Sequence, residues 1–88
     1  MVQLNDDSVH DISKRLRRAH GQLAGVIRML EEGQDCQKVL MQLSAVNKAV
    51  SRAGYATLAS GLTQCYESKE GLTEQDKKYL EKLFLSLA

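Results

Sequence analysis

Cys36 and Cys65 are the two cysteines of the chain, and they stand 29 residues apart. A thiolate is both a nucleophile and a soft metal ligand, so a pair of thiols can bind Cu(I) or undergo disulfide and persulfide chemistry. The second cysteine lies in the stretch SGLTQCY, where Gly61 precedes it by about one helical turn and offers no side chain. The question is which group cooperates with each thiol.

Metal binding and sulfur chemistry place different demands on such a pair. A closed zinc site takes four ligands, so two thiols are two short. His10 and His20 are the only imidazoles, and both precede the first cysteine. Cu(I) accepts two thiolates with or without an imidazole. Sulfur chemistry needs only an accessible nucleophile and a second thiol that resolves the adduct, so both possibilities remain open at this point.

The elements that position these thiols are expected to be helices. The 88 residues contain no proline and few β-branched residues, which predicts one all-α domain over residues 1–88. The N-terminus lacks the pattern of a signal peptide, and no apolar run approaches the roughly 18 residues of a membrane span. Two cysteines are too few for a disulfide-stapled secreted scaffold. We therefore expect a cytoplasmic protein that does not associate with a membrane.

The first helix is predicted to begin at Ser8, with Asp11 completing an approximate capping box, and to end at Glu32–Gly33 with Gly33 in the C′ position. Its apolar residues follow three-and-four spacing and predict one buried face: Ile12, Leu16, Ala19, Leu23, Val26, Ile27 and Leu30.

The second helix is predicted to start after an Asp35 N-cap, with Cys36 in its first turn, and to run to about Tyr66. Its apolar stripe comprises Val39, Leu43, Val46, Val50 and Ala53, widened by Leu40, Leu58 and Leu62. The polar stretch ESKEG predicts a loop. Thr73 with Asp76 predicts the start of a third helix, whose apolar face comprises Leu80, Leu83, Phe84 and Leu87.

The net charge of +1 hides a segregation of charge along the chain. Residues 12–30 and 36–66 contain no acidic residue, and together they hold eight cations: Lys14, Arg15, Arg17, Arg18, Arg28, Lys38, Lys48 and Arg52. Basic residues on a helix commonly form a solvated face, but two neighbouring helices without acids predict a basic surface suited to DNA phosphates.

The length of the second helix predicts an oligomer. A helix of about 30 residues extends roughly 45 Å, whereas a compact 88-residue monomer has a radius of gyration near 12 Å. Cys36 and Cys65 would be about 43 Å apart along that helix, while a disulfide needs Cα atoms within about 7 Å. In an antiparallel dimer, Cys36 of one chain can instead face Cys65 of the other. An antiparallel helical bundle between protomers is therefore expected.

Three blocks of the sequence resemble a known family. RLRRAHGQLAGVIRMLEEGQDC, LMQLSAVNKAVSRAG and LTQC are similar, in order and spacing, to the CsoR/RcnR family of bacterial transcriptional repressors. The resemblance implies a three-helix protomer, an antiparallel four-helix-bundle dimer and a dimer-of-dimers tetramer. It also implies operator DNA binding that an inducer releases, with Arg15, Arg18 and Arg52 as the main contacts and Lys14, Arg17 and Lys48 supporting them.

The resemblance also identifies the departure at Gly61. In the copper sensors of the family, a cysteine opening the second helix joins a His-x-x-x-Cys pair of the partner chain. Cys36 and Cys65 match the two thiols, but Gly61 occupies the position of the histidine. Glu81 aligns roughly with an acidic position that supports the copper ligands, and here a solvated charge is expected. The branch that keeps both cysteines and lacks the histidine is the persulfide-sensing CstR branch, which this sequence resembles.

These observations lead to a hypothesis with two alternatives. The chain is expected to be a repressor without a resident cofactor in which a persulfide or polysulfide sulfurates Cys36. Cys36 lies where the helix macrodipole favours a thiolate. The partner's Cys65 then closes a disulfide or a longer sulfur bridge and DNA is released. The alternatives are a Cu(I)-responsive repressor that uses the same two thiolates, and a structural helical-bundle adaptor. No motif of an enzyme is evident.

Overall fold

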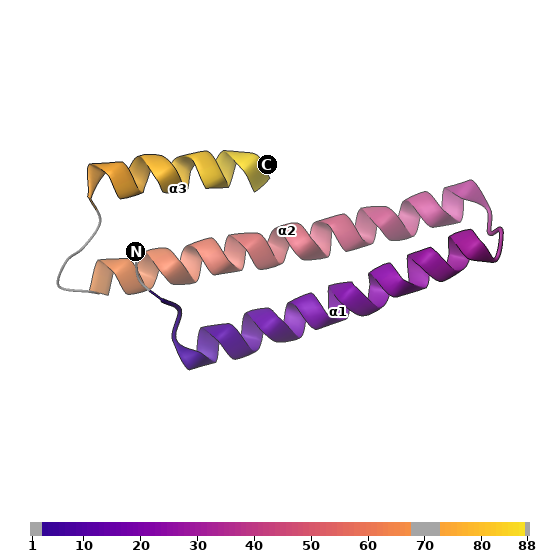
Figure 1. The fold of residues 1–88 in the computed structure, drawn as a ribbon, viewed down its shortest axis with the longest axis horizontal. Coiled ribbons are helices and arrows are strands. Elements are labelled where there is room, and N and C mark those ends of the chain that lie inside the picture. Colours follow the sequence, from indigo (N-terminus) through magenta and orange to yellow (C-terminus); the bar gives the residue numbers. More distant parts are fainter. Residues whose placement is uncertain (1–2, 68–72, 88) are drawn as a thin grey trace.

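The computed structural model describes residues 3–67 and 73–87, without the side chains of residues 65–67, and these ranges form three helices (Figure 1). Helix α1 spans Asp6–Glu31, α2 spans Cys36–Glu67 and α3 spans Glu74–Leu87. α1 and α2 form an antiparallel hairpin, and α3 lies beside the C-terminal half of α2, on the side away from α1 (Figure 1). The all-helical, three-helix protomer is confirmed for the described residues.

The N-terminus of α1 corrects the predicted cap. The side chain of Asn5 accepts a hydrogen bond from the backbone N–H of Ser8 at 2.8 Å, so Asn5 is the N-cap and Ser8 lies inside the helix. Asp6 and Asp7 therefore occupy the first turn, where their negative charges interact favourably with the positive end of the helix dipole. The helix begins two residues earlier than predicted because an asparagine caps as well as a serine.

The turn between α1 and α2 agrees with the prediction. Gly33 has φ +72°, the left-handed conformation that glycine adopts without a steric penalty. The N–H of Gln34 donates to the carbonyl of Met29 at 2.9 Å, and the N–H of Gly33 donates to that of Leu30 at 3.1 Å. These two bonds form a Schellman motif, which ends α1 and places Cys36 as the first residue of α2.

The seam between α1 and α2 is narrow. The buried apolar residues recur every seventh position on each helix, and they are Ile12, Ala19, Val26, Val39, Val46 and Ala53. Val26, Val39 and Val46 form one cluster, against which Met29 packs. A seven-residue repeat keeps one line of each helix against its neighbour, so α1 and α2 meet along that line over most of their lengths.

The remainder of the predicted apolar faces is not buried in the protomer. Residues that lie three positions before or four positions after the seam residues are exposed, although they were expected to be core: Leu16, Leu23, Leu30, Leu43 and Val50. Leu40, Ile27 and Leu62 are exposed as well. The predicted apolar face of each helix is wider than the buried seam, because a single neighbouring helix covers only one line of side chains.

Helix α3 begins with the predicted capping box. The N–H of Asp76 donates to the Thr73 hydroxyl at 3.0 Å, and the N–H of Thr73 donates to the Asp76 carboxylate at 3.4 Å. The Tyr55 and Phe84 rings pack with centroids 5.5 Å apart, which joins α3 to α2. None of the residues described in α3 is buried. Of the predicted loop ESKEG, Glu67 belongs to α2, and the other four residues lie outside the described ranges.

The protomer is a slab one helix thick. Its principal extents are 54 × 25 × 13 Å and its radius of gyration is 16.6 Å, against about 12 Å for a compact chain of this length. The 13 Å dimension is close to the diameter of one helix with its side chains. Both broad faces of the slab therefore lack a second layer. Among the described helices, none is long and apolar enough to cross a membrane.

Candidate functional site

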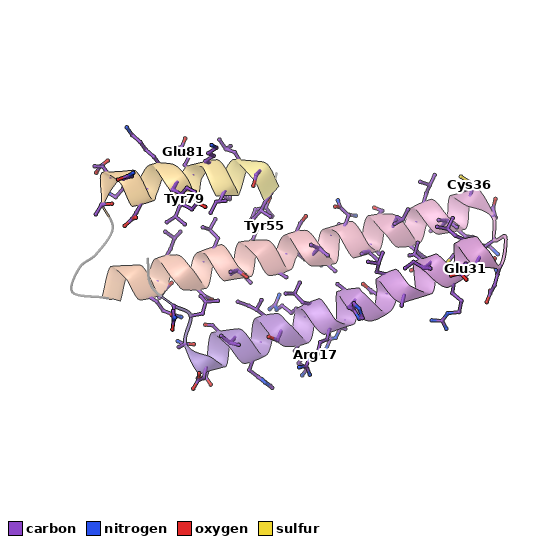
Figure 2. The ribbon with its side chains drawn as sticks, viewed as in Figure 1. Arg17, Glu31, Cys36, Tyr55, Tyr79 and Glu81 are labelled. Atoms are coloured by element: carbon purple, nitrogen blue, oxygen red, sulfur yellow. The ribbon has the colours of Figure 1, made fainter. Side chains whose placement is uncertain are left out.

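The two thiol positions lie at opposite ends of α2. Cys36 is exposed and not in a disulfide, and it lies at the hairpin end of the molecule (Figure 2). Cys65 lies in the last turn of α2, and its side chain is not among those that the structure describes. Because α2 is one continuous helix, the two residues are separated by about 43 Å along its axis. Within one chain the two thiols do not meet.

Gly61 leaves an open space one turn before Cys65. A Cβ atom placed on Gly61 would meet nothing within 4 Å, apart from the helix's own backbone. Among the described side chains, no three His, Cys, Asp or Glu residues are grouped closely enough to hold a metal ion. His10 and His20 lie exposed on α1, and Glu81 lies exposed on α3. The two thiols of α2 by themselves suit two-coordinate Cu(I) but not a closed zinc site.

A second group of residues gathers across the α1–α2 seam. Arg15, Arg18 and Gln22 of α1 and Ala49 and Arg52 of α2 line one shallow hollow of about 220 Å³. Helical spacing explains the grouping, because positions three after, four before or one before a seam residue lie on one side of the seam. Arg18 and Arg52 directly precede the seam residues Ala19 and Ala53. The exposed leucines occupy the other side. We call Arg15, Arg18, Gln22 and Arg52 the basic face.

One member of the basic face is paired within its own helix. Nε of Arg15 donates to a carboxylate oxygen of Asp11 at 3.2 Å, one turn away. Both side chains are more than half exposed, so the pair is weak in water. Arg15 therefore has an acidic neighbour although residues 12–30 contain none, because Asp11 lies just before that stretch and reaches Arg15 across one turn.

The other three residues expected to contact DNA do not line the hollow of the basic face. Lys14 and Arg17 line a different shallow hollow, together with Asp6 and His10. Arg17 projects from the edge of α1 that faces away from α2 (Figure 2). Lys48 is exposed on α2. Of the six residues expected to contact DNA, the structure brings together Arg15, Arg18 and Arg52.

Two neighbours of these arginines carried a weaker sequence signal. Gln22 also lines the hollow of the basic face. It follows Arg15 by seven residues, about two helical turns, and this spacing indicates that the two side chains lie on the same side of α1. Asp11 was assigned to a capping box, while its i,i+4 spacing to Arg15 indicates the ion pair that forms.

Comparisons with known proteins give the following matches. A family model described as metal-sensitive transcriptional repressor matches residues 8–86. The copper-sensing transcriptional repressor RicR of Mycobacterium tuberculosis (strain ATCC 25618 / H37Rv) is 43% identical over 53 residues, which are 60% of this chain and 55% of RicR. The copper-sensing transcriptional repressor CsoR of Mycobacterium ulcerans (strain Agy99) is 43% identical over 54 residues, 61% of this chain and 46% of that protein.

The CsoR of Mycobacterium bovis (strain BCG / Pasteur 1173P2), also named copper-sensing, is 37% identical over 54 residues, 61% of this chain and 45% of that protein. The matched part of the chain thus spans about half the length of these curated relatives. No solved structure matches the chain.

Proposed function

Because the chain belongs to the family of metal-sensitive transcriptional repressors, we propose that it binds operator DNA through its basic face and releases it when an inducer acts on Cys36 and the partner's Cys65. The family is one of transcriptional repressors and not of enzymes. Cationic side chains from two helices on one side of the seam support the DNA interface, since phosphates are bound mainly through such charges. We place the protein in the cytoplasm, where its operator lies.

An antiparallel dimer is part of this proposal, because one chain cannot bring its own thiols together. The exposed apolar residues support it: they lie beside the seam on the side opposite the basic face, and a second slab stacked there would bury them. Two hairpins would form a four-helix bundle with the basic faces outward, and two such dimers would form the proposed tetramer.

Reactive sulfur is the inducer that the site itself supports, and Gly61 is the observation that carries this choice. Position 61 carries no imidazole, and two thiols suffice for sulfur transfer. The Cys36 thiolate attacks the outer sulfur of a persulfide R–S–SH, forming Cys36–S–SH and releasing R–S⁻. The thiolate of the partner's Cys65 then attacks the inner sulfur, forming the disulfide and releasing HS⁻. A donor that leaves two sulfur atoms on Cys36 gives a trisulfide by the same displacement.

Cu(I) is the second candidate inducer, and the comparisons favour it over sulfur, since the matched relatives are named copper-sensing. Cys36 and the partner's Cys65 would supply two thiolates, ligands that Cu(I) prefers. Copper bound there would link the two protomers at the same place as the sulfur bridge. This chain lacks the third donor at position 61, so copper is expected to bind as a two-coordinate ion.

A DNA-release assay separates these functions. Binding to the DNA upstream of the chain's own gene is measured by fluorescence anisotropy over a range of salt concentrations, before and after anaerobic addition of sodium tetrasulfide or buffered Cu(I). Salt-dependent binding that tetrasulfide abolishes, with crosslinked dimers of disulfide or trisulfide mass, supports the sulfur sensor. Release by Cu(I) alone supports the copper sensor. The absence of salt-dependent binding would leave the structural adaptor as the remaining function.

Replacing Cys36 by alanine separates sensing from DNA binding. We expect C36A to bind DNA with unchanged affinity and to lose the response to its inducer, because Cys36 is exposed and is not one of the buried core residues. The exposed α2 residue Ser44 gives the control variant S44A, which should keep both properties. Loss of DNA affinity in C36A would assign Cys36 a structural role instead.

A further inference from the structure

A hollow of about 420 Å³ lies between α2 and α3 and includes Gly61. Three parts of the chain line it: the segment before α1, the second half of α2, and α3. The lining residues used below are Gly54, Thr57, Gly61, Phe84, Ser86 and Leu87. We call this space the Gly61 hollow.

The Gly61 hollow suits a hydrocarbon side chain. No charged residue lines it, and its two hydroxyl groups already donate within their own helices. Thr57 Oγ1 donates to the Ala53 carbonyl at 2.8 Å, and Ser86 Oγ donates to the Leu83 carbonyl at 2.6 Å. A polar ligand would find no free donor there and would lose its bonds to water.

The two glycines of the hollow differ in what occupies the space beside them. A Cβ placed on Gly54 would lie 2.9 Å from Leu87 Cδ2, so the end of α3 already fills that notch. A Cβ placed on Gly61 would meet nothing within 4 Å. One leucine-sized notch is therefore filled from within the protomer, and the other is open.

A matching apolar side chain stands at the other end of α2. Leu40 is 59% exposed and lies four residues after Cys36, while Gly61 lies four residues before Cys65. Leu40 and Gly61 are 21 residues apart, which is three heptads, so they share one side of the helix. In an antiparallel pair of α2 helices, the register that sets Cys36 opposite the partner's Cys65 also sets Leu40 opposite the partner's Gly61.

We infer that Leu40 of each protomer seats in the Gly61 hollow of its partner, and that this contact sets the register of the thiol pair. The inference rests on the dimer of the proposed function and adds the residues that align it. The occupant is a second copy of this chain, because one face carries both the projecting side chain and the hollow. A two-fold axis repeats the contact at both ends of the interface. Because Phe84 and Leu87 line the hollow, α3 becomes part of the thiol site.

Exchanging the sizes of the two residues tests the inference. Filling the hollow in G61L should weaken self-association about tenfold, since overpacking a fitted site is costly. L40A should weaken it comparably by removing the projecting side chain. The double variant L40A/G61L supplies the leucine from the other side and should restore association to within about threefold, as expected for coupled sites. Circular dichroism checks that each variant remains helical.

Two measurements report the result. Sedimentation equilibrium gives the association constant, and diamide, which accepts two electrons and two protons from a pair of thiols, gives the yield of the Cys36–Cys65 interchain disulfide. G21L and M41A are matched controls. Gly21 also has nothing within 4 Å of a Cβ but lies on α1, and Met41 is an exposed neighbour of Leu40 about 100° around the helix. Both controls should associate and crosslink like the wild type.

Restoration in the double variant of both association and crosslinking supports the inference. Wild-type behaviour of G61L, or a double variant no better than G61L, overturns it while leaving the dimer and the repressor function in place. A wild-type chain that sediments as a monomer at every concentration overturns the proposed dimer, and the inference with it.

Discussion

Gly33 closes the hairpin that places Cys36, and its backbone conformation makes a direct stability prediction. At φ +72°, a side chain at this position would clash with its own backbone. We expect G33A to lower the free energy of unfolding by about 1 kcal/mol. Urea denaturation at a fixed protein concentration measures the change.

The same substitution at Gly21 is the control, since Gly21 lies inside α1 with nothing within 4 Å of a Cβ. There alanine should raise the stability by up to about 1 kcal/mol, because alanine has the higher helix propensity. Equal effects of the two substitutions would contradict a conformational role for Gly33.

Individual residues also show where sequence reasoning succeeds and fails. Gly33 and the Thr73–Asp76 box were predictable, because each leaves a local signature within four residues. The choice of Asn5 over Ser8 as N-cap was not, since both are good caps and three-dimensional context selects one. The ion pair between Asp11 and Arg15 was not predicted for a similar reason, because the position of Asp11 fits both a capping box and an i,i+4 ion pair.

At the scale of elements, the pairing of α1 with α2 builds the basic face from both helices. Arg18 and Arg52 share one hollow although they stand far apart in the sequence. We expect R18A and R52A each to weaken operator binding at every salt concentration. Each should reduce the slope of log K against log [salt] by about 1 for every subunit whose arginine contacts a phosphate. Arg17, on the far edge of α1, gives the control R17A, with a smaller effect expected.

The ion pair between Asp11 and Arg15 allows a test in which operator binding is expected to become tighter. D11N removes the carboxylate that holds Nε of Arg15 and leaves a side chain of the same shape. Operator binding should then tighten, most clearly at low salt, because one more cation is free and one negative charge is gone. Unchanged or weaker binding would argue against a phosphate contact by Arg15.

The helices themselves were largely predictable and their burial was not. Apolar spacing indicated the extents of α2 and α3 closely, because periodicity is a property of the chain alone. It did not separate the seam residues from their neighbours: Ala19 is buried and Leu23 is exposed, although both fit one helical stripe. Whether a residue such as Ala19 or Leu23 is buried depends on the number of helices packed against α1, and the local sequence pattern does not contain that information.

At the scale of the whole molecule, the slab has a basic face and an apolar face on opposite sides of the seam. An isolated protomer leaves the apolar face in water, so we expect folding and association to be coupled. The unfolding temperature should rise with protein concentration, measured by circular dichroism over a hundredfold range. A midpoint independent of concentration in that range would indicate that the protomer is stable alone or that the assembly never dissociates, and sedimentation separates the two.

The 13 Å thickness of the protomer also bears on how its mutations are classified. A residue such as Leu23 counts as a surface position in one chain, and polar replacements there would be scored as harmless. In the proposed assembly the same residue lies between two layers, so such replacements would act with the severity of core mutations.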